Sequence, residues 1–540
     1  MGKPMNRRSF VSGVGGLLLG STGIASLAGC STVTRSTDIK AMNRGVKLPA
    51  YRPWEGPKPD LPASGRIPAA FRHYPKDTER TITRRPGDGS RLSGTVPVSG
   101  PIPPGVDQNR YWRELNRQLN LDIELNMAPG PDFPDKLQTS IAGDTLGDVW
   151  NIFGTPPYLP QLLQAKAQDL TPYLSGSEIL KYPFLANLPT ESWRGCVFAG
   201  KIYAVPVVRG VLAANTMLSR ADLFRKRGVD PNFTSIDELL EIGRKMTDER
   251  RNMWAFSQVP NTVLSTMLDM PNVWKEENGR FTHESEMEER KEQLEVGRRM
   301  SAEGMLHPDA INSFNGKVWF PQGATAMIQD TFSGLPSFYQ QATVDDFEIA
   351  MPTIPGPDGK PGKVWFAPNN SITAISATSP ERTRMILEVL NWAAAPFGTK
   401  EYTFRKYGIE GHDFNFKDGE PRSTRAGNSE TVLTYFPLGY FVDTAPPIYY
   451  AGFPDAADAV YENLRHSAES MILNAGYGLY SPTYASKQAL LGTLLDNAAK
   501  DIYRGRKPVS SWDETMKDWR ARGGEAIRRE FEEAQETRER

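Results

Sequence analysis

The sequence is poor in the residues on which disulfide frameworks and zinc sites depend. Its 540 residues include two cysteines, Cys30 and Cys196, and five histidines. If Cys30 carries a lipid, as argued below, Cys196 has no partner, so the folded body must be held together by the size of its core. The histidines show no His-x-x-x-His spacing. We therefore expect no intrachain disulfide, no metal site and no cofactor.

Two further absences limit the binding partners that we expect for the protein. The 63 basic and 64 acidic residues leave a net charge of −1, which gives no general attraction to nucleic acid or to an anionic membrane. After residue 33 no uncharged apolar run reaches about 18 residues, so we expect no membrane span in the body. The length is sufficient for roughly two or three ordinary domains with a sizeable core.

The N-terminal segment has the layout of an export signal. Paired Arg7 and Arg8 precede an uncharged stretch, residues 9–33, and their surroundings resemble a twin-arginine signal. Leu27-Ala28-Gly29-Cys30 resembles a bacterial lipobox, which places the cut before Cys30 and a lipid such as palmitate on its sulfur. A lone buried cysteine within the signal is the alternative, and the export route, Tat or Sec, stays open. We expect residues 1–29 to be a lipoprotein signal peptide.

Composition and periodicity divide the remaining chain. Residues 30–98 are rich in Pro, Gly, Arg and Lys, and we expect a tether and N-terminal arm there, of which a part packs on the body. From Val106 onwards helical and strand patterns alternate. Tyr111, Leu115 and Leu119 share one helical face, and residues 122–127 alternate as a strand. This order favours an open, largely parallel sheet.

The stretch from Gly200 to Asn215 indicates where the chain passes from one sheet to another. Two short apolar runs flank Pro206, which cannot donate a hydrogen bond to a sheet ladder. We therefore expect the chain to leave one sheet at Pro206 and to enter another. On these residues alone, a single kinked strand inside one domain fits equally well.

Five motif stretches follow one another in a characteristic order. They are Gly143–Phe153, Gly200–Pro206, Phe320–Gln329, Ile372–Trp392 and Tyr407–Phe414. Behind a lipobox, this set resembles the extracellular solute-binding proteins of ABC importers, specifically the family 1 lipoproteins of the large sugar- and oligosaccharide-binding subgroup. The resemblance covers roughly residues 107–506.

The resemblance implies an α/β fold of the periplasmic-binding-protein type II, in which two lobes are joined by crossing hinge segments and carry extra C-terminal helices. Lobe 1 would comprise residues 99–208 and 355–396, and lobe 2 residues 209–354 and 397–540. The ligand would lie between the lobes, at the carboxyl ends of the strands.

One departure from the family pattern concerns calcium. Many members of the large subgroup carry a calcium loop after the helix that ends here at Met246. In this chain the corresponding residues, 247–254, include two arginines where oxygen ligands would stand, which argues against a calcium site.

Binding of sugars requires flat aromatic faces and planar polar groups. Strand ends, the crossover and an aromatic loop place such residues near the expected cleft. The candidate ligand-binding residues are Trp150, Asn151, Arg209, Gln329, Asp330, Trp365, Asn369, Asn370, Tyr435 and Tyr440. Core packing is the alternative for each aromatic residue, and a strand-end hydrogen bond or a surface salt bridge is the alternative for Asp330, Asn151 and Arg209. The prediction therefore rests on the cluster.

The expected function is capture of an oligosaccharide or related carbohydrate for delivery to the permease subunits of an ABC transporter. We expect a monomer, lipid-anchored on the extracytoplasmic face of the bacterial cell membrane through Cys30, that performs no catalysis. A secreted glycoside hydrolase or lyase is the main alternative, although Asp148 and Asp330 are the only acids in an apolar strand-end setting. Binding of another solute, such as a peptide, is a further alternative.

Overall fold

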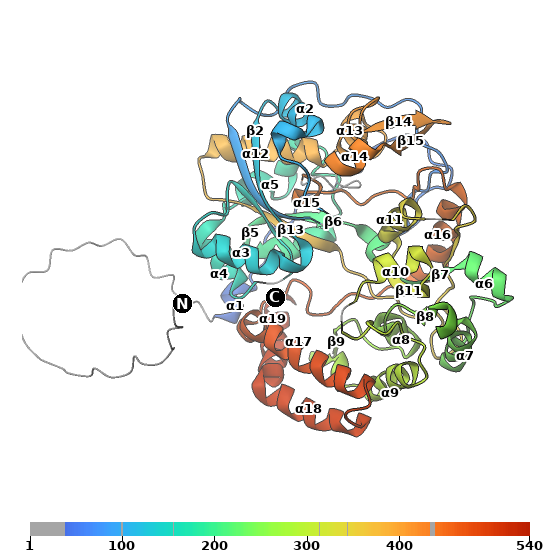
Figure 1. Ribbon diagram of the computed structural model, residues 1–540. Helices are drawn as coiled ribbons and strands as arrows, with labels where there is room; N and C mark the ends of the chain where they lie inside the picture. Colours follow the sequence, from blue (N-terminus) through green and yellow to red (C-terminus); the bar gives the residue numbers. More distant parts are fainter. Residues whose placement is uncertain are drawn as a thin grey trace, which may run out of the picture. The chain divides into compact units, whose positions relative to one another are not determined.

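The computed structural model describes residues 38–98, 101–154, 156–312, 314–342, 344–431 and 438–539. The predictions for the signal peptide, for Cys30 and for Tyr435 fall outside these residues. Two β-sheets organise the described chain (Figure 1). We refer to the elements packed around the five-stranded sheet as lobe 1 and to those around the four-stranded sheet as lobe 2.

The sheet of lobe 1 has the strand order β2-β1-β3-β13-β6. Its strands are β1 (Arg91–Val98), β2 (Asp122–Pro129), β3 (Val149–Ile152), β6 (Ala204–Val208) and β13 (Asn369–Ile375). β1 runs parallel to β2 and β3, whereas β13 is antiparallel to both β3 and β6. The carboxyl ends of β1, β2, β3 and β6 and the amino end of β13 therefore meet at one edge of the sheet.

The sheet of lobe 2 has the order β12-β7-β11-β8 and is buried on both faces. Its strands are β7 (Asn215–Arg220), β8 (Trp254–Phe256), β11 (Thr325–Thr331) and β12 (Ile349–Ala350). Met217 and Met327 belong to one hydrophobic cluster, and their chain neighbours Leu218 and Ile328 belong to another. Because successive side chains of a strand point to opposite faces, each face of this sheet has its own core.

Further helices and short strands surround the two sheets. The helices are α2 (Arg110–Leu119), α3 (Phe133–Ala142), α4 (Leu159–Lys166), α5 (Thr171–Leu174), α6 (Ala221–Arg227), α7 (Ile236–Met246), α8 (Asn261–Met267), α9 (Glu289–Ala302), α10 (Gly316–Gln322), α11 (Leu335–Gln340), α12 (Pro380–Ala393), α13 (Lys400–Tyr407), α14 (Arg425–Glu430), α15 (Leu438–Phe441) and α16 (Pro454–Ser467). The short strands are β4 (Val197–Phe198), β5 (Lys201–Ile202), β9 (Trp274–Glu277), β10 (Arg280–His283), β14 (Phe414–Lys417) and β15 (Glu420–Ser423). The alternation of helix and strand predicted after Val106 is thus observed.

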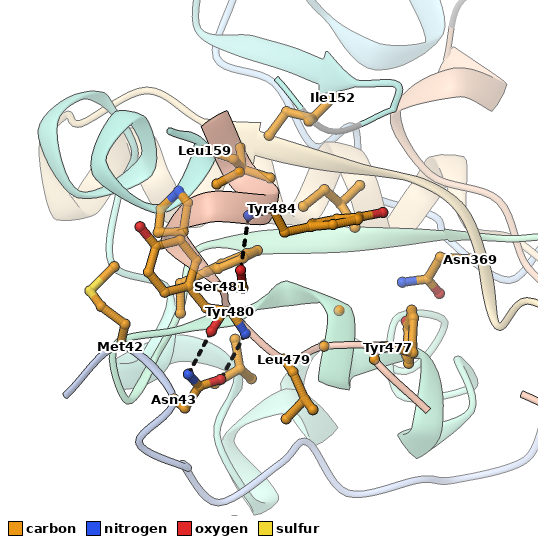
Figure 2. A pocket seen from close by; sticks show the side chains of 18 of the residues that line it. Met42, Asn43, Ile152, Leu159, Asn369, Tyr477, Leu479, Tyr480, Ser481 and Tyr484 are labelled. Atoms are coloured by element: carbon orange, nitrogen blue, oxygen red, sulfur yellow. Dashed lines mark hydrogen bonds between the residues drawn. The ribbon is translucent and has the colours of Figure 1, made fainter. Parts of the chain in front are cut away.

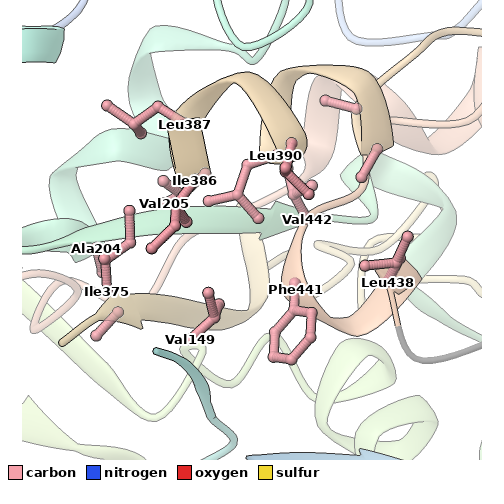
Figure 3. Close-up of a cluster of buried hydrophobic side chains, with 14 of the residues drawn as sticks. Val149, Ala204, Val205, Ile375, Ile386, Leu387, Leu390, Leu438, Phe441 and Val442 are labelled. Atoms are coloured by element: carbon pink, nitrogen blue, oxygen red, sulfur yellow. The ribbon is translucent and has the colours of Figure 1, made fainter. Parts of the chain in front are cut away.

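Helix α12 packs on the lobe 1 sheet. It begins at Pro380, where the side chain of Ser379 accepts a hydrogen bond from the backbone N–H of Arg382. Its buried Ile386 and Leu387 belong to the same cluster as the strand residues beneath them (Figure 3). The predicted α/β class follows from this packing of helices on a sheet. The sheet itself is mixed, with two parallel and two antiparallel pairings, so the expectation of a largely parallel sheet is met only for β1, β2 and β3.

Two lobe boundaries differ from the prediction. Strand β1, expected within the arm, pairs with a strand on each side in the lobe 1 sheet. The segment from α13 to α15, expected in lobe 2, packs on lobe 1, where Leu438 and Phe441 are part of the core (Figure 3). The two differences are linked, because a Cβ atom on Gly94 of β1 would lie 2.6 Å from the ring of Phe441.

The predicted crossover between two sheets is confirmed, although not at the residue expected. Pro206 lies inside β6, opposite Ile372 of β13, and the chain leaves the sheet only at Arg209. β6 is an edge strand, where a residue without an N–H group is tolerated. A single kinked strand is excluded, because β7 belongs to the other sheet.

The arm packs on the body along its described part, from residue 38 to 90. It begins with α1 (Ile39–Met42), which is capped by the side chain of Asp38. The N–H of Ala50 donates to the carbonyl of Gly176, and the N–H of Phe71 donates to the carbonyl of Ile448. These bonds tie the arm to segments that are far from it in sequence.

The C-terminal helices α17 (Pro482–Tyr503), α18 (Trp512–Trp519) and α19 (Glu525–Glu539) complete the core of lobe 2. The run of arginines and glutamates after Glu525 is typical of a solvated helix, yet one face of α19 packs on the body. Ile527 and Phe531 of α19 are buried, and Glu530 accepts hydrogen bonds from Ser481 and Thr483 at the start of α17. In the described part of the chain, none of the helices combines the length and apolarity that a membrane crossing requires.

A buried carboxyl group in lobe 2 predicts a pH-dependent stability. Burial raises the pKa of Glu284 to about 7 against the attraction of Arg290, and its Oε2 atom has no hydrogen-bond partner among the described residues. Since this pKa lies above the unfolded value of about 4.3, the folded state loses stability as the pH rises between the two values.

Glu284→Gln should therefore increase the free energy of unfolding at about pH 8 by about 1–3 kcal/mol more than at about pH 4. Urea unfolding at both pH values measures this difference. Glu288→Gln, a substitution of a carboxylate whose side chain is 83 % exposed, serves as the control. An equal effect of Glu284→Gln at both pH values would contradict the prediction.

Candidate ligand-binding site

A cavity of about 320 Å³ lies at the edge of the lobe 1 sheet where the parallel strands end (Figure 2). Lobe 1 contributes Ile152 at the end of β3 and residues 369–372 at the start of β13. Residues 474–485, which lead into α17 of lobe 2, form the opposite wall, and residues 42–45 of the arm form a third. The volume is in the range of ligand pockets, and the edge is the one predicted from the sequence.

Three tyrosines of the segment 474–485 line this cavity. Tyr480 is buried and its hydroxyl accepts a hydrogen bond from Gln161. Tyr477 and Tyr484 are partly exposed, and their rings stand on the cavity side of the segment (Figure 2). Aromatic rings in such a position offer apolar faces to a ligand while their hydroxyl groups stay polar.

Asn369 provides a polar group on the facing wall. Its Nδ2 atom donates to the carbonyl of Ser192 at 2.7 Å, and the Tyr477 hydroxyl donates to the same carbonyl at 3.3 Å. The Oδ1 atom of Asn369 is buried and has no hydrogen-bond partner among the described residues. Its neighbour Asn370 is exposed and also lines the cavity. The site thus combines an unpaired amide oxygen with aromatic faces.

Two other candidates of lobe 1 belong to its core. Trp150 is completely buried in β3, paired with Thr95 on one side and Ala374 on the other, which leaves no face for a sugar. Asn151 is also fully buried, and its Nδ2 atom donates to Ser371 Oγ at 3.0 Å and to the carbonyl of Tyr440. For Trp150 the core-packing alternative describes the structure, and for Asn151 the alternative of a hydrogen-bonding role does.

Tyr440, a further candidate, is 5 % exposed and lies in the same core as Trp150. It comes from α15, the helix that packs beneath β1 and β3. Its ring does not line the cavity. Tyr435 lies outside the described residues, so its role remains a prediction.

Arg209 is engaged in a buried ion cluster instead of facing the cavity. Its Nη1 atom lies 2.6 Å from Asp443 Oδ2, while Arg405 Nη2 lies 2.9 Å from Oδ1 and Lys406 Nζ lies 3.5 Å from Oδ2. Burial alone would raise the pKa of Asp443, but Lys406, Arg405 and Arg209 outweigh it and lower this pKa to about 2. The cluster fixes the start of the crossover against α13.

The candidates of lobe 2 have structural partners as well. Gln329 accepts hydrogen bonds from the N–H groups of Thr262 and Val263 and so caps the first turn of α8. Asp330 pairs with Lys317 at 3.2 Å. None of these groups lines the cavity.

Trp365 is half-buried, and its indole N–H donates to the carbonyl of Met270 at 3.2 Å. It precedes β13 on the second crossing segment and does not line the cavity. Among the described candidates, Asn369 and Asn370 are therefore the ones that the structure brings to the cavity.

Sequence reasoning missed two of the three walls. The segment 474–485 has a recognisable signal, because glycines and tyrosines alternate in Gly476-Tyr477-Gly478-Leu479-Tyr480 just before a helix start. Residues 42–45 have no such signal, since nothing in their composition indicates that an arm returns to the cavity.

Among the described residues, one cluster contains three neighbouring side chains of the kinds that bind metal ions. The ligand atoms of His412, Asp413 and Glu430 all lie within 4.8 Å. His412 Nε2 is 3.0 Å from Glu430 Oε1, and the second oxygen of Glu430 accepts from the N–H of Tyr111. Asp413 similarly accepts from the N–H of Ile409. These hydrogen bonds give each side chain a structural role, and we assign no ion to the cluster.

Two side chains considered for catalysis, Asp148 and Cys196, lie in structural surroundings. Asp148 accepts from the backbone and hydroxyl of Ser93 and pairs with Arg382 at 3.2 Å, outside the cavity. Cys196 is fully buried, and burial raises the pKa of its thiol well above the usual range. A thiol in this state is a poor nucleophile at neutral pH.

Comparison with known proteins shows similarity to carbohydrate-binding proteins of transporters. The sequence matches no protein-family model. It is 21 % identical over 452 residues to the polygalacturonan/rhamnogalacturonan-binding protein YtcQ of Bacillus subtilis (strain 168), a match that covers 79 % of this chain and 88 % of YtcQ.

Solved structures establish the fold. The substrate-binding protein FusA of Streptococcus pneumoniae, in complex with kestose, has a TM-score of 0.62 at 13 % identity and covers 83 % of this chain and 99 % of its own. The N-glycan transport protein NgtS of Streptococcus pneumoniae gives 0.61 at 14 %, covering 84 % and 100 %. The alginate-binding protein AlgQ2 gives 0.59 at 14 %, covering 85 % and 100 %. The chain has the two-lobed fold of ABC-transporter solute-binding proteins, and the resemblance predicted from the sequence is confirmed.

Proposed function

We propose that the protein is the substrate-binding component of an ABC importer and that it captures an oligosaccharide in the cavity between β13 and the segment 474–485. Three observations support the proposal: the fold, the cavity at the strand ends, and the similarity to proteins such as YtcQ and NgtS whose names state carbohydrate ligands. Carbohydrate capture for delivery across the membrane is the function that a substrate-binding component of this kind would have.

The observation that carries the proposal is the buried, unpaired Oδ1 atom of Asn369 beside the ring of Tyr477. A buried acceptor without a partner costs about 1–3 kcal/mol. A sugar hydroxyl can donate to this oxygen, while the apolar C–H face of the same sugar packs on the tyrosine ring. Both requirements of carbohydrate recognition thus meet at one place.

The two walls belong to different lobes, which links binding to closure. Asn369 lies on the lobe 1 sheet, and Tyr477 and Tyr484 lie on the segment that leads into the helices of lobe 2. A ligand that contacts both walls stabilises the closed arrangement by the difference between its affinities for the closed and open states. The closed state is then the form that a permease recognises.

The anchoring and export of the protein belong to the same proposal. Residues 1–29 would be removed as a lipoprotein signal peptide, with export by the twin-arginine or the Sec route, and Cys30 would carry the lipid. The body would act as a monomer on the extracytoplasmic face of the cell membrane, next to the permease subunits, and would release its ligand chemically unchanged.

Substitution of the cavity residues tests the function. Asn369→Ala and Tyr477→Ala are each expected to weaken oligosaccharide binding by about 1–3 kcal/mol, because each removes a group that contacts the ligand. The protein for these measurements is the chain after Cys30, which we call the soluble body. Titration calorimetry of the soluble body with a panel of neutral and acidic oligosaccharides measures the affinity, and chromatography of the same samples detects cleavage.

Asn415→Ala, a substitution at an exposed position of β14 away from the cavity, is the matched control. Unchanged affinity in both cavity variants, with an unchanged fold, would refute the site. Cleaved sugar would establish the enzyme alternative, and a response to peptides alone would replace the carbohydrate by another solute.

A further inference from the structure

The charge that lines the cavity is of one sign, and it is positive. Of the described residues that line it, Arg44 is the single charged one, and no aspartate or glutamate is among them. The remaining lining consists of glycines and of uncharged side chains, which are aromatic, aliphatic, amide, hydroxyl or thioether in kind. A ligand in this cavity therefore meets a guanidinium group and no opposing carboxylate.

Arg44 has no competing partner. Its side chain is exposed, and its guanidinium forms no ion pair or hydrogen bond with any residue that the structure describes. Its carbon stem passes over Gly200, where an added Cβ atom would lie 3.2 Å from Arg44 Cδ. Gly200 has a φ of +75° in the turn between β4 and β5, so a bare glycine backbone supports the stem.

The arm holds Arg44 in place by bonds to both walls. The carbonyl of Met42 accepts from the N–H of Ala199 at 2.9 Å on the lobe 1 side. On the other side, Asn43 Nδ2 donates to the carbonyl of Tyr480 at 3.0 Å, and Asn43 Oδ1 accepts from the N–H of Tyr480 at 2.8 Å (Figure 2). Arg44 follows directly on these contacts, so its Cα position is set while its guanidinium stays available.

We propose that the ligand is an acidic oligosaccharide, with carboxylates of the uronic acid type, and that Arg44 binds one of these carboxylates. This inference rests on the proposed function and specifies its substrate class. A guanidinium group presents paired N–H donors that match the two oxygens of a carboxylate. The absence of acidic side chains from the lining removes the repulsion that would oppose such a ligand. The arginine suggested by the sequence, Arg209, is buried against Asp443 and does not line the cavity.

The test compares charged and neutral sugars of equal size. The probes are trimers of galacturonate, mannuronate and glucuronate, each beside its carboxyl-reduced neutral counterpart, titrated into the soluble body. We expect at least one uronate trimer to bind about tenfold or more tightly than its reduced counterpart. Arg44→Gln should abolish this preference and leave the affinity for the neutral trimer unchanged, and Arg44→Lys should retain part of it.

Arg250→Gln, at an exposed position of lobe 2 outside the cavity lining, is the control and should change neither affinity. Equal binding of charged and neutral trimers by the wild type would overturn the inference while the proposed function stands. An equal loss for both trimers in Arg44→Gln would also overturn it, because Arg44 would then only shape the wall. If none of the carbohydrates binds, the proposed function fails and the inference fails with it.

Discussion

Replacement of Asp443 by alanine is expected to lower the free energy of unfolding by about 3–5 kcal/mol. Asp443 is 2 % exposed and is the anion that Arg209, Arg405 and Lys406 share. Without it, three buried cations would face one another in a medium of low polarity, which is more costly than the loss of any single hydrogen bond. Urea unfolding followed by tryptophan fluorescence measures the effect.

The pH dependence gives this prediction a second readout. The pKa of Asp443 in the folded state is about 2, below the unfolded value of about 3.9, so its stabilisation is complete above the unfolded value and is lost as the pH falls towards about 2. The deficit of the variant relative to the wild type should therefore shrink in acid. Asp443→Asn provides a milder variant if the alanine protein does not fold.

Asp358→Ala, at a carboxylate that is 60 % exposed, should change stability by less than about 0.5 kcal/mol. A deficit of Asp443→Ala below about 1 kcal/mol, or one that is independent of pH, would mean that the cluster does not hold the crossover in place.

Trp150→Ala should have an effect of similar size for a different reason. Trp150 is completely buried between β1 and β13, and removal of its ring leaves a cavity in the core, at a cost of about 3–5 kcal/mol. Ligand affinity of the folded fraction should remain unchanged, because the ring does not line the cavity. Urea unfolding and titration calorimetry on the same preparation separate the two effects.

Trp150→Phe keeps the test possible if the alanine variant is insoluble, with a smaller loss of stability. Trp365→Ala is the matched control, because Trp365 is half-buried and should cost less stability. Weaker ligand binding at unchanged stability in the Trp150 variants would return this residue to the ligand-binding set.

The fold could be predicted wherever the sequence carries a local signal. The start of α12 at Ser379-Pro380 and the passage from one sheet to another near Pro206 follow from capping and strand chemistry. Strand β1 was missed because Gly94 and Pro97 interrupt its apolar alternation. Gly94 is required by the ring of Phe441, a residue far away in sequence, so no local pattern could indicate the reason for it.

The sequence placed the cleft at the sheet edge where the cavity lies, but few of the candidate side chains line that cavity. Strand order places Asn369 and Asn370 at that edge, and these residues line the cavity. Arg209 was misread because its partner Asp443 comes from a segment that folds back onto lobe 1. Arg44 could not be found, because its position depends on how the arm bonds to Tyr480 and Ala199.

A crystal structure of the soluble body with the tightest-binding oligosaccharide would show where the ligand lies. We expect density for an intact sugar in the cavity, with a hydroxyl within hydrogen-bond distance of Asn369 Oδ1 and a pyranose face on Tyr477 or Tyr484. Density for a sugar at another place, with this cavity holding only water, would show that the cavity is not the binding site.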